Sequence, residues 1–189
     1  MAVAELIARR RFTVDEYHRM AEAGILGEDD RVELLEGEIV EMSPIGRRHQ
    51  ACVDRLTQWL VPALRGRAIV RVQGSVRLSD ISAPQPDVVL LRPRQDFYAT
   101  VDPGPDNVFL VIEVADSSLR YDQGIKVPLY ARHGIPEVWV VDLAEERVLV
   151  YRDPVPGVGY RAVDVLGRMH RLAPQAFPDL ELAVDELLS

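Results

Sequence analysis

The sequence predicts an α/β fold in which helices pack on a mixed β-sheet, and three observations lead to this prediction. The chain has 189 residues, a length that favours one domain able to bury a substantial core. Two nearly continuous apolar runs, residues 87–91 and 108–114, are typical of strands buried on both faces of a sheet. Helical and strand patterns follow one another in the order helix, strand, strand, strand, helix, strand. We therefore expect one layered domain over residues 1–189.

Residues 12–46 predict a helix and a hairpin that precede the core. Thr13–Glu16 reads as a capping box, so a short helix begins there and ends at Gly24. Residues 32–42 have the pattern of two short strands around a turn at Glu36–Gly37.

The first core helix is expected over residues 48–64, because its apolar side chains recur at spacings of three and four. Gly66 ends it. The next segment, Val70 to Leu78, alternates apolar and polar residues, which predicts a strand with one face toward solvent. The two apolar runs named above then supply the central strands.

A second core helix is expected within residues 122–133. Pro128 lies inside this segment, so the helix either bends or begins later. Residues 138–142 form the next buried strand and complete a core of residues 47–142.

The C-terminal region, residues 143–189, predicts a closing hairpin and a tail. Its two strands are expected at residues 147–151 and 160–166, on either side of a turn rich in glycine and proline.

The composition argues against several classes of protein. The apolar runs are far shorter than the roughly 20 residues of a membrane span, so no membrane segment is expected. The N-terminal residues lack the charge order of a secretory signal, and the single cysteine, Cys52, allows no disulfide framework. These features predict a cytoplasmic protein.

The charge balance argues against an extended basic surface for nucleic acid. The formal net charge is −8, from 30 acidic and 22 basic residues. A local groove can still be positive, and a bound divalent cation reverses the sign of an acidic pocket. Lys126 is the only lysine among the basic residues, which directs attention to its position.

Two acidic residues occupy strands that are otherwise apolar. Asp87 begins the first apolar run, and Glu113 lies near the end of the second. A buried carboxylate is unfavourable unless it is paired, hydrogen-bonded or bound to metal. The alternatives to a functional role are a turn cap for Asp87 and an arginine partner for Glu113.

The connection between the two apolar strands shows no helical pattern, so the strands are expected to be antiparallel neighbours. If Leu91 faces Val108, Asp87 falls opposite Ile112 and next to Glu113, within a register error of about two residues. The two carboxylates would then meet at one edge of the sheet.

A carboxylate pair of this kind supplies part of the oxygen coordination that Mg²⁺ prefers, and Mn²⁺ has the same preference for oxygen ligands. Metal-assisted attack of water on phosphate is its natural chemistry. Lys126 lies 13 residues beyond Glu113, on the following helix. Its ammonium can orient or deprotonate the attacking water and offset developing charge, although a surface position is the alternative.

Five segments of the chain together form a specific pattern: Val32–Pro44, Pro86–Asp87, Ile112–Ser118, Tyr121–Lys126 and Leu129–Asp142. In this order they closely resemble the Uma2 family, a bacterial family of unknown function whose fold is similar to that of the PD-(D/E)xK restriction-endonuclease-like nucleases. The resemblance covers the chain from about Phe12 onward and implies a restriction-endonuclease-like core of order αβββαβ.

This resemblance implies roles for individual residues. Asp87 is the motif aspartate, Glu113 the motif glutamate, and the backbone carbonyl of Val114 a third metal ligand. The nuclease pattern has its lysine two residues after the glutamate, where this chain has Ala115, so Lys126 must reach the same point from the helix. Some of these nucleases add a helix-borne glutamate, and the low-ranked candidates for its place are Glu33, Glu38 and His49.

The function implied is a Mg²⁺-dependent endonuclease or phosphodiesterase that hydrolyses nucleic-acid phosphodiester bonds. The alternative is a nuclease fold without catalysis that serves as a binding or assembly module, which the net charge and Ala115 favour. If DNA is bound, arginines such as Arg71, Arg77 or Arg120 are expected to touch phosphate. A homodimer is expected by analogy with other endonuclease-like folds.

Overall fold

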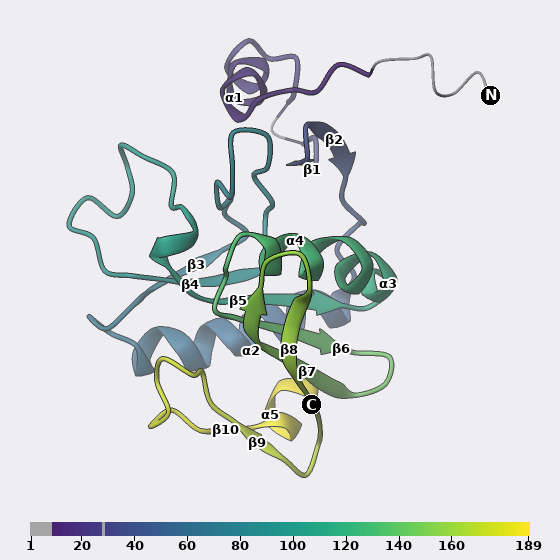
Figure 1. Ribbon diagram of the computed structural model, residues 1–189. Helices are drawn as coiled ribbons and strands as arrows, with labels where there is room; N and C mark the ends of the chain where they lie inside the picture. The colour runs from purple at the N-terminus through teal and green to yellow at the C-terminus, as the bar shows by residue number, and fades with distance from the viewer. Residues whose placement is uncertain (1–8, 28) are drawn as a thin grey trace.

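A six-stranded mixed sheet forms the centre of the structure (Figure 1). This computed structural model describes residues 9–27 and 29–189, so the N-terminal residues used to exclude a secretory signal lie largely outside it. The strand order is β3-β4-β5-β6-β7-β8; β5 and β6 pair in parallel, and the other neighbours are antiparallel. The strands are β3 Ile69–Val72, β4 Val88–Leu91, β5 Val108–Ala115, β6 Glu137–Asp142, β7 Arg147–Val155 and β8 Gly159–Gly167.

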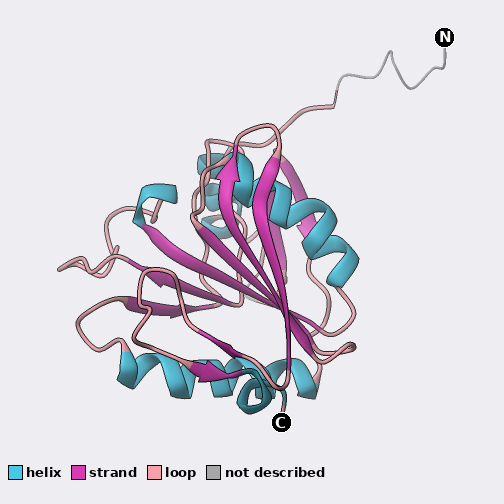
Figure 2. Cartoon of the chain, turned by 60° about the horizontal axis from the view of Figure 1, so that its bottom comes forward, coloured by secondary structure: helices cyan, strands magenta, loops and turns pink. Residues whose placement is uncertain are grey.

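Helices cover both faces of this sheet (Figure 2). Helix α2, Arg47–Ala63, packs on one face, where Leu56 and its neighbours meet Leu110 and Ile112. Helix α4, Val127–Arg132, packs on the other face. Because side chains alternate along a strand, the even-numbered residues of β5 from Leu110 onward face α2 and the odd-numbered ones face α4. Glu113 therefore points away from α2.

The N-terminal extension has the predicted helix and hairpin. Helix α1, Val14–Glu22, begins with the Thr13 capping box. Strands β1, Val32–Leu35, and β2, Glu38–Glu41, form the hairpin. The backbone N–H of Ala83 donates to the carbonyl of Leu34 at 2.8 Å, so the hairpin docks on the segment that leads into β4.

The C-terminal region has the predicted β7–β8 hairpin, followed by small elements that complete the core under α2. Leu172, Leu182 and Leu187 of these elements are buried in the same cluster as Leu56. The elements are β9 Arg171–Leu172, β10 Leu182–Ala183 and α5 Val184–Leu188.

Two predicted elements have different bounds in the structure. The strand expected from Val70 to Leu78 ends at Val72, because Gln73 adopts a positive φ of 49° and turns the chain away from β4. Val76 and Leu78 are nevertheless buried, which explains the alternating pattern.

The second core helix begins earlier than expected and is not uniform. It consists of α3, Leu119–Tyr121, a π-helical turn over Asp122–Lys126, and α4. Pro128 lies in the first turn of α4, where the π-helical turn that precedes it accommodates the missing N–H. A short 3₁₀ helix at Pro105–Asn107 precedes β5.

In the part of the chain that the structure describes, no helix has the length and apolar character needed to cross a membrane.

Candidate functional site

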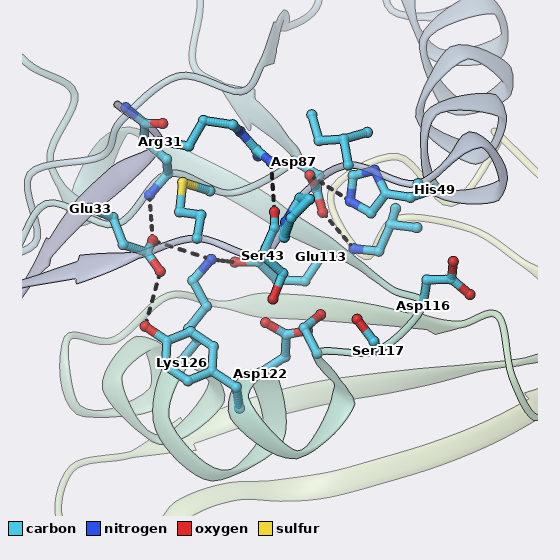
Figure 3. Close-up of a pocket in the computed structure, with 18 of the residues that line it drawn as sticks. Arg31, Glu33, Ser43, His49, Asp87, Glu113, Asp116, Ser117, Asp122 and Lys126 are labelled. Carbon is cyan, nitrogen blue, oxygen red and sulfur yellow. Dashed lines mark hydrogen bonds and ion pairs between the residues drawn. The ribbon is translucent and has the colours of Figure 1, made fainter. Parts of the chain in front are cut away.

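A pocket of about 380 Å³ lies where the end of β5 meets the start of β4 (Figure 3). Four further parts of the chain line it: the β1–β2 hairpin and its exit, the first turn of α2, α3, and the π-helical turn. Segments from the N-terminal extension and from the core therefore build one cavity.

The β4–β5 register brings the two strand carboxylates together. Leu91 pairs with Val108, as the sequence analysis assumed. A bulge beside Leu91 then shifts the register by one residue, so that continuation of the ladder places Asp87 opposite Glu113 instead of Ile112. The sequence-based register was wrong by this single residue.

The carboxylate of Asp87 is held from two sides. Its Oδ2 accepts the backbone N–H of Val114 at 2.8 Å, and its Oδ1 lies 3.0 Å from Nε2 of His49 on α2. In a strand, the N–H and C=O of one residue point to the same side, so the carbonyl of Val114 also points toward β4. Continuation of the ladder places Pro86 opposite it, and proline has no N–H to donate.

Glu113 binds the only lysine of the chain. Its Oε1 lies 2.9 Å from Nζ of Lys126 and accepts the hydroxyl of Tyr130 at 2.6 Å. Oε2 of Glu113 accepts no hydrogen bond within the described residues, and the residue lines the pocket. One carboxylate oxygen is thus committed to the helix, and the other is available at the pocket wall.

Glu33 of the hairpin supplies a second carboxylate to the same ammonium. Its Oε2 lies 3.3 Å from Nζ of Lys126 and accepts the backbone N–H of Gln85 at 3.0 Å. Its Oε1 accepts the hydroxyl of Tyr121 at 3.1 Å. Figure 3 shows the Lys126 side chain reaching between Glu33 and Glu113.

The π-helical turn places several polar side chains on the pocket side of this helix. Asp122 and Lys126 lie at its two ends, both are buried, and both line the pocket. Tyr130 follows Lys126 by four residues, so both side chains reach Glu113. A π-helical turn widens the helix locally and is frequent at functional sites.

Burial and neighbouring charges shift the pKa values in this cluster. Burial raises the pKa of Glu113 to about 8, although the nearby Lys126 ammonium opposes the shift. Burial also raises the pKa of Asp122. Burial alone would lower the pKa of Lys126, but the carboxylates of Glu113 and Glu33 more than compensate and raise it, so the amine remains an ammonium at neutral pH.

The cluster carries a surplus of acidic groups. Four buried carboxyl groups share one buried ammonium, and they belong to Glu33, Asp87, Glu113 and Asp122. A raised pKa at Glu113 is the expected response to this surplus, because one proton partly replaces the missing positive charge.

The model of the Uma2 family, described as "Putative restriction endonuclease", matches residues 14–185. This chain belongs to the Uma2 family. The family prediction made from the motifs is therefore confirmed.

Among solved structures, the Uma2 chain is similar to a protein from Anabaena variabilis ATCC 29413 described as "a putative nuclease belonging to DUF820". The TM-score is 0.72 at 17% sequence identity, over 94% of this chain and 97% of that one. The match shows a shared fold, and the mixed sheet with helices on both faces confirms the predicted α/β fold class. Among curated proteins, no sequence matches.

Most residues proposed from the sequence lie in one place in this Uma2 structure. Asp87, Glu113, Val114 and Lys126 line the pocket, as do Glu33 and His49, which ranked low. Glu38 does not: it is exposed on β2 and pairs with Arg9 at 3.5 Å. The structure therefore does not bring Glu38 to the other candidates, because the docked hairpin turns Glu33 toward the pocket and Glu38 toward solvent.

The sequence analysis missed Tyr121, Asp122 and Tyr130. The available signal was spacing, since Asp122 and Tyr130 stand four residues before and after Lys126. Of the arginines expected near phosphate, only Arg120 lines the pocket. Arg71 instead donates to the carbonyl of Phe97, and Arg77 pairs with Asp15 and Asp80.

The donor set of this pocket fits a hard divalent cation. Over residues 9–27 and 29–189, no three His, Cys, Asp or Glu side chains form a metal-binding group. Two carboxylates, Asp87 and Glu113, and the carbonyl of Val114 are available instead. Mg²⁺ commonly uses one or two carboxylates and keeps several waters, so this smaller set suits it.

Proposed function

We propose that this Uma2 protein is a Mg²⁺- or Mn²⁺-dependent phosphodiesterase of nuclease type. The observation that carries the proposal is the position of Lys126, whose Nζ lies 2.9 Å from Oε1 of Glu113 in the acidic pocket. The nuclease pattern expects a lysine at the place of Ala115, and the helix-borne Lys126 supplies an ammonium to the same glutamate. The family description supports the same class of activity.

In this proposal Asp87, Glu113 and the carbonyl of Val114 hold the metal. The bound ion would polarise a phosphoryl oxygen and lower the pKa of a coordinated water. The N–H of Val114 and the ring of His49 hold the Asp87 carboxylate in a fixed orientation. Fixed ligands reduce the reorganisation needed when a cation and a phosphate enter.

Lys126 acts as a fixed positive charge. Its raised pKa keeps it protonated, so it orients the attacking water and offsets negative charge on phosphate, and it is not the base that deprotonates the water. Tyr130 shares the Glu113 oxygen and limits the movement of that carboxylate.

Two arginines favour a phosphate substrate. Arg31 and Arg120 both line the pocket, and neither forms an ion pair with a carboxylate in the described part of the chain. Nη1 of Arg31 donates to the carbonyl of Ser43 at 2.6 Å, and the remaining N–H groups of the two guanidiniums can bind a phosphate that lies over the acidic floor. A nucleic-acid phosphodiester has the required charge.

The test is cleavage of plasmid and single-stranded DNA in Mg²⁺ or Mn²⁺ by the wild-type protein and its variants. Asp87→Asn and Lys126→Met are each expected to lower the cleavage rate about 10²–10³-fold, the usual effect of removing one electrostatic contact to a transition state. Glu38→Gln is the matched control, because Glu38 is exposed outside the pocket. Undiminished cleavage by Asp87→Asn would remove the assignment.

The alternative is a nuclease fold that binds without hydrolysis, which Ala115 and the net charge of −8 favour. Calorimetric titration with Mn²⁺ separates the two. The proposed site gives saturable binding that Glu113→Gln abolishes, whereas an inert module gives none. The homodimer expected by analogy stays a prediction, which light scattering of the purified protein checks.

A further inference from the structure

A second pocket, of about 390 Å³, lies between α2, the turn from β6 to β7 and the last residues of the chain, beside the candidate site. Its lining residues are Arg47, Arg48, Ala51, Arg55, Leu143, Glu146, Leu188 and Ser189. Arg47 and Arg55 are two helical turns apart, so they share one face of the helix. Three guanidinium groups therefore meet in one hollow of a protein whose net charge is −8.

Most of this positive charge is not neutralised. In the described ranges, Arg47 and Arg55 form no ion pair, and Arg55 donates only to the carbonyl of Leu187 at 3.5 Å. Glu146, the acidic residue of the pocket, is already bound by Arg168 at 2.8 and 2.9 Å. Hydrogen bonds from Arg168 lower the pKa of Glu146, so this carboxylate is committed elsewhere.

Arg48 connects the two pockets. Its guanidinium lies 3.5 Å from Asp116, which lines the candidate site, and it donates to the carbonyl of Leu143, which lines the second pocket. The two cavities are therefore neighbours along the first half of α2. A strand that leaves the candidate site on this side would meet Arg48 first.

We infer that this basic pocket binds backbone phosphates of a nucleic-acid strand that continues past the candidate site. The inference rests on the proposed function and narrows its substrate to polynucleotides. Arg47 and Arg55 are eight residues apart, about 12 Å along the helix, which spans about three to four nucleotides of a duplex strand. A mononucleotide diester is too short to occupy both pockets.

The test measures the binding of a fluorescent single-stranded oligonucleotide of about 12 nucleotides. Fluorescence anisotropy reports the binding in a buffer that contains Ca²⁺, at several salt concentrations. The double variant Arg47→Gln/Arg55→Gln is compared with Arg65→Gln/Arg161→Gln. The control pair removes the same charge from exposed arginines that have no ion-pair partner in the described structure. Loss of two phosphate contacts is expected to weaken binding about tenfold and to reduce the salt slope by about 1.4, while the control keeps the wild-type slope.

The outcome that overturns the inference is equal affinity and equal slope for the two double variants, or no oligonucleotide binding by the wild-type protein. The single variant Arg47→Gln is a control for misfolding, because Arg47 makes no ion pair in the described structure. The salt slope of its oligonucleotide binding should fall by about 0.7. If binding follows this pattern but no DNA is cleaved, the phosphate pocket stands and the catalytic proposal falls. If Asp87-dependent cleavage is seen while Arg47 and Arg55 are dispensable, only the pocket inference falls.

Discussion

Buried carboxylates on the neighbouring strands β5 and β6 behave differently. Glu137, at the start of β6, is fully buried and accepts hydrogen bonds from Arg152 at 2.9 Å, Trp139 at 2.9 Å and the backbone of Gln175 at 2.6 Å. Asp142, at the other end of β6, accepts from Arg147 at 2.9 Å and from the backbone of Glu145 at 3.1 Å. Each of these carboxylates has its own arginine.

Glu113 on β5 is equally buried but shares its cation. Lys126 also serves Glu33, and Asp87 and Asp122 add further negative charge nearby. The difference shows that burial of a carboxylate does not by itself mark a functional site. The proposed site rests instead on a local excess of carboxylates over cations, which a positive ligand would balance.

The largest loss of stability is expected from removing the charge of Glu137, the carboxylate that has its own arginine. Glu137→Gln should lower the free energy of unfolding by about 1.5–3 kcal/mol, because Arg152 loses a charged partner and the other bonds weaken. Urea denaturation at neutral pH measures this. A Glu137→Gln protein as stable as the wild type would show that β6 does not depend on this pair.

The matched change on β5 should have an effect of opposite sign, a gain of stability that increases with pH. The pKa of Glu113 is about 8 in the folded chain and about 4.5 when unfolded, so between these values the folded protein retains a proton that the unfolded chain has lost. Wild-type stability therefore falls as pH rises through this window. Glu113→Gln removes this pH dependence. The free energy of unfolding of the variant should therefore exceed that of the wild type by up to about 1.4 kcal/mol for each pH unit within the window.

Urea denaturation in the presence of a chelator, at the two ends of that pH window, checks this expectation. The two proteins should be about equally stable at the acidic end, and Glu113→Gln more stable at the alkaline end. A variant that is less stable than the wild type at alkaline pH would mean that Glu113 is a satisfied ion-pair partner like Glu137.

The smallest effect on stability is expected for an ion pair that is exposed to solvent. Arg67 binds Asp179 through two hydrogen bonds of 2.7 and 2.8 Å, and both side chains are substantially exposed. Asp179→Asn should lower the free energy of unfolding far less than Glu137→Gln does, because water screens an exposed ion pair. If the loss equals that of Glu137→Gln, burial is not what makes the β6 pairs strong.

The strand-borne part of the site could be predicted from the sequence, because apolar runs reveal central strands and interrupting acids stand out in them. The convergence of Asp87 and Glu113 followed from one assumed pair, Leu91 with Val108, which the structure contains. The one-residue bulge could not be predicted, because no side chain in that segment marks it.

The parts of the candidate site that other elements contribute were harder to predict from the sequence. Glu33 reaches Lys126 only because the hairpin docks at Ala83, a long-range contact that local patterns do not contain. The π-helical turn was also missed, since such turns are rare, occur mostly as single turns within α-helices and have no side-chain pattern of their own. His49 ranked low because its contact with Asp87 depends on where α2 lies on the sheet.

The location of Lys126 on a helix has an evolutionary consequence. A one-residue shift within a strand sends every later side chain to the opposite face, whereas a helical turn can gain or lose a residue and leave the sheet register intact. The amine proposed to take part in catalysis, when carried on such a turn, can change its position in the sequence at little risk to the core. Searches that require a lysine two positions after the glutamate will miss proteins of this kind. Searches for a lysine that lies close to the glutamate in space will find them.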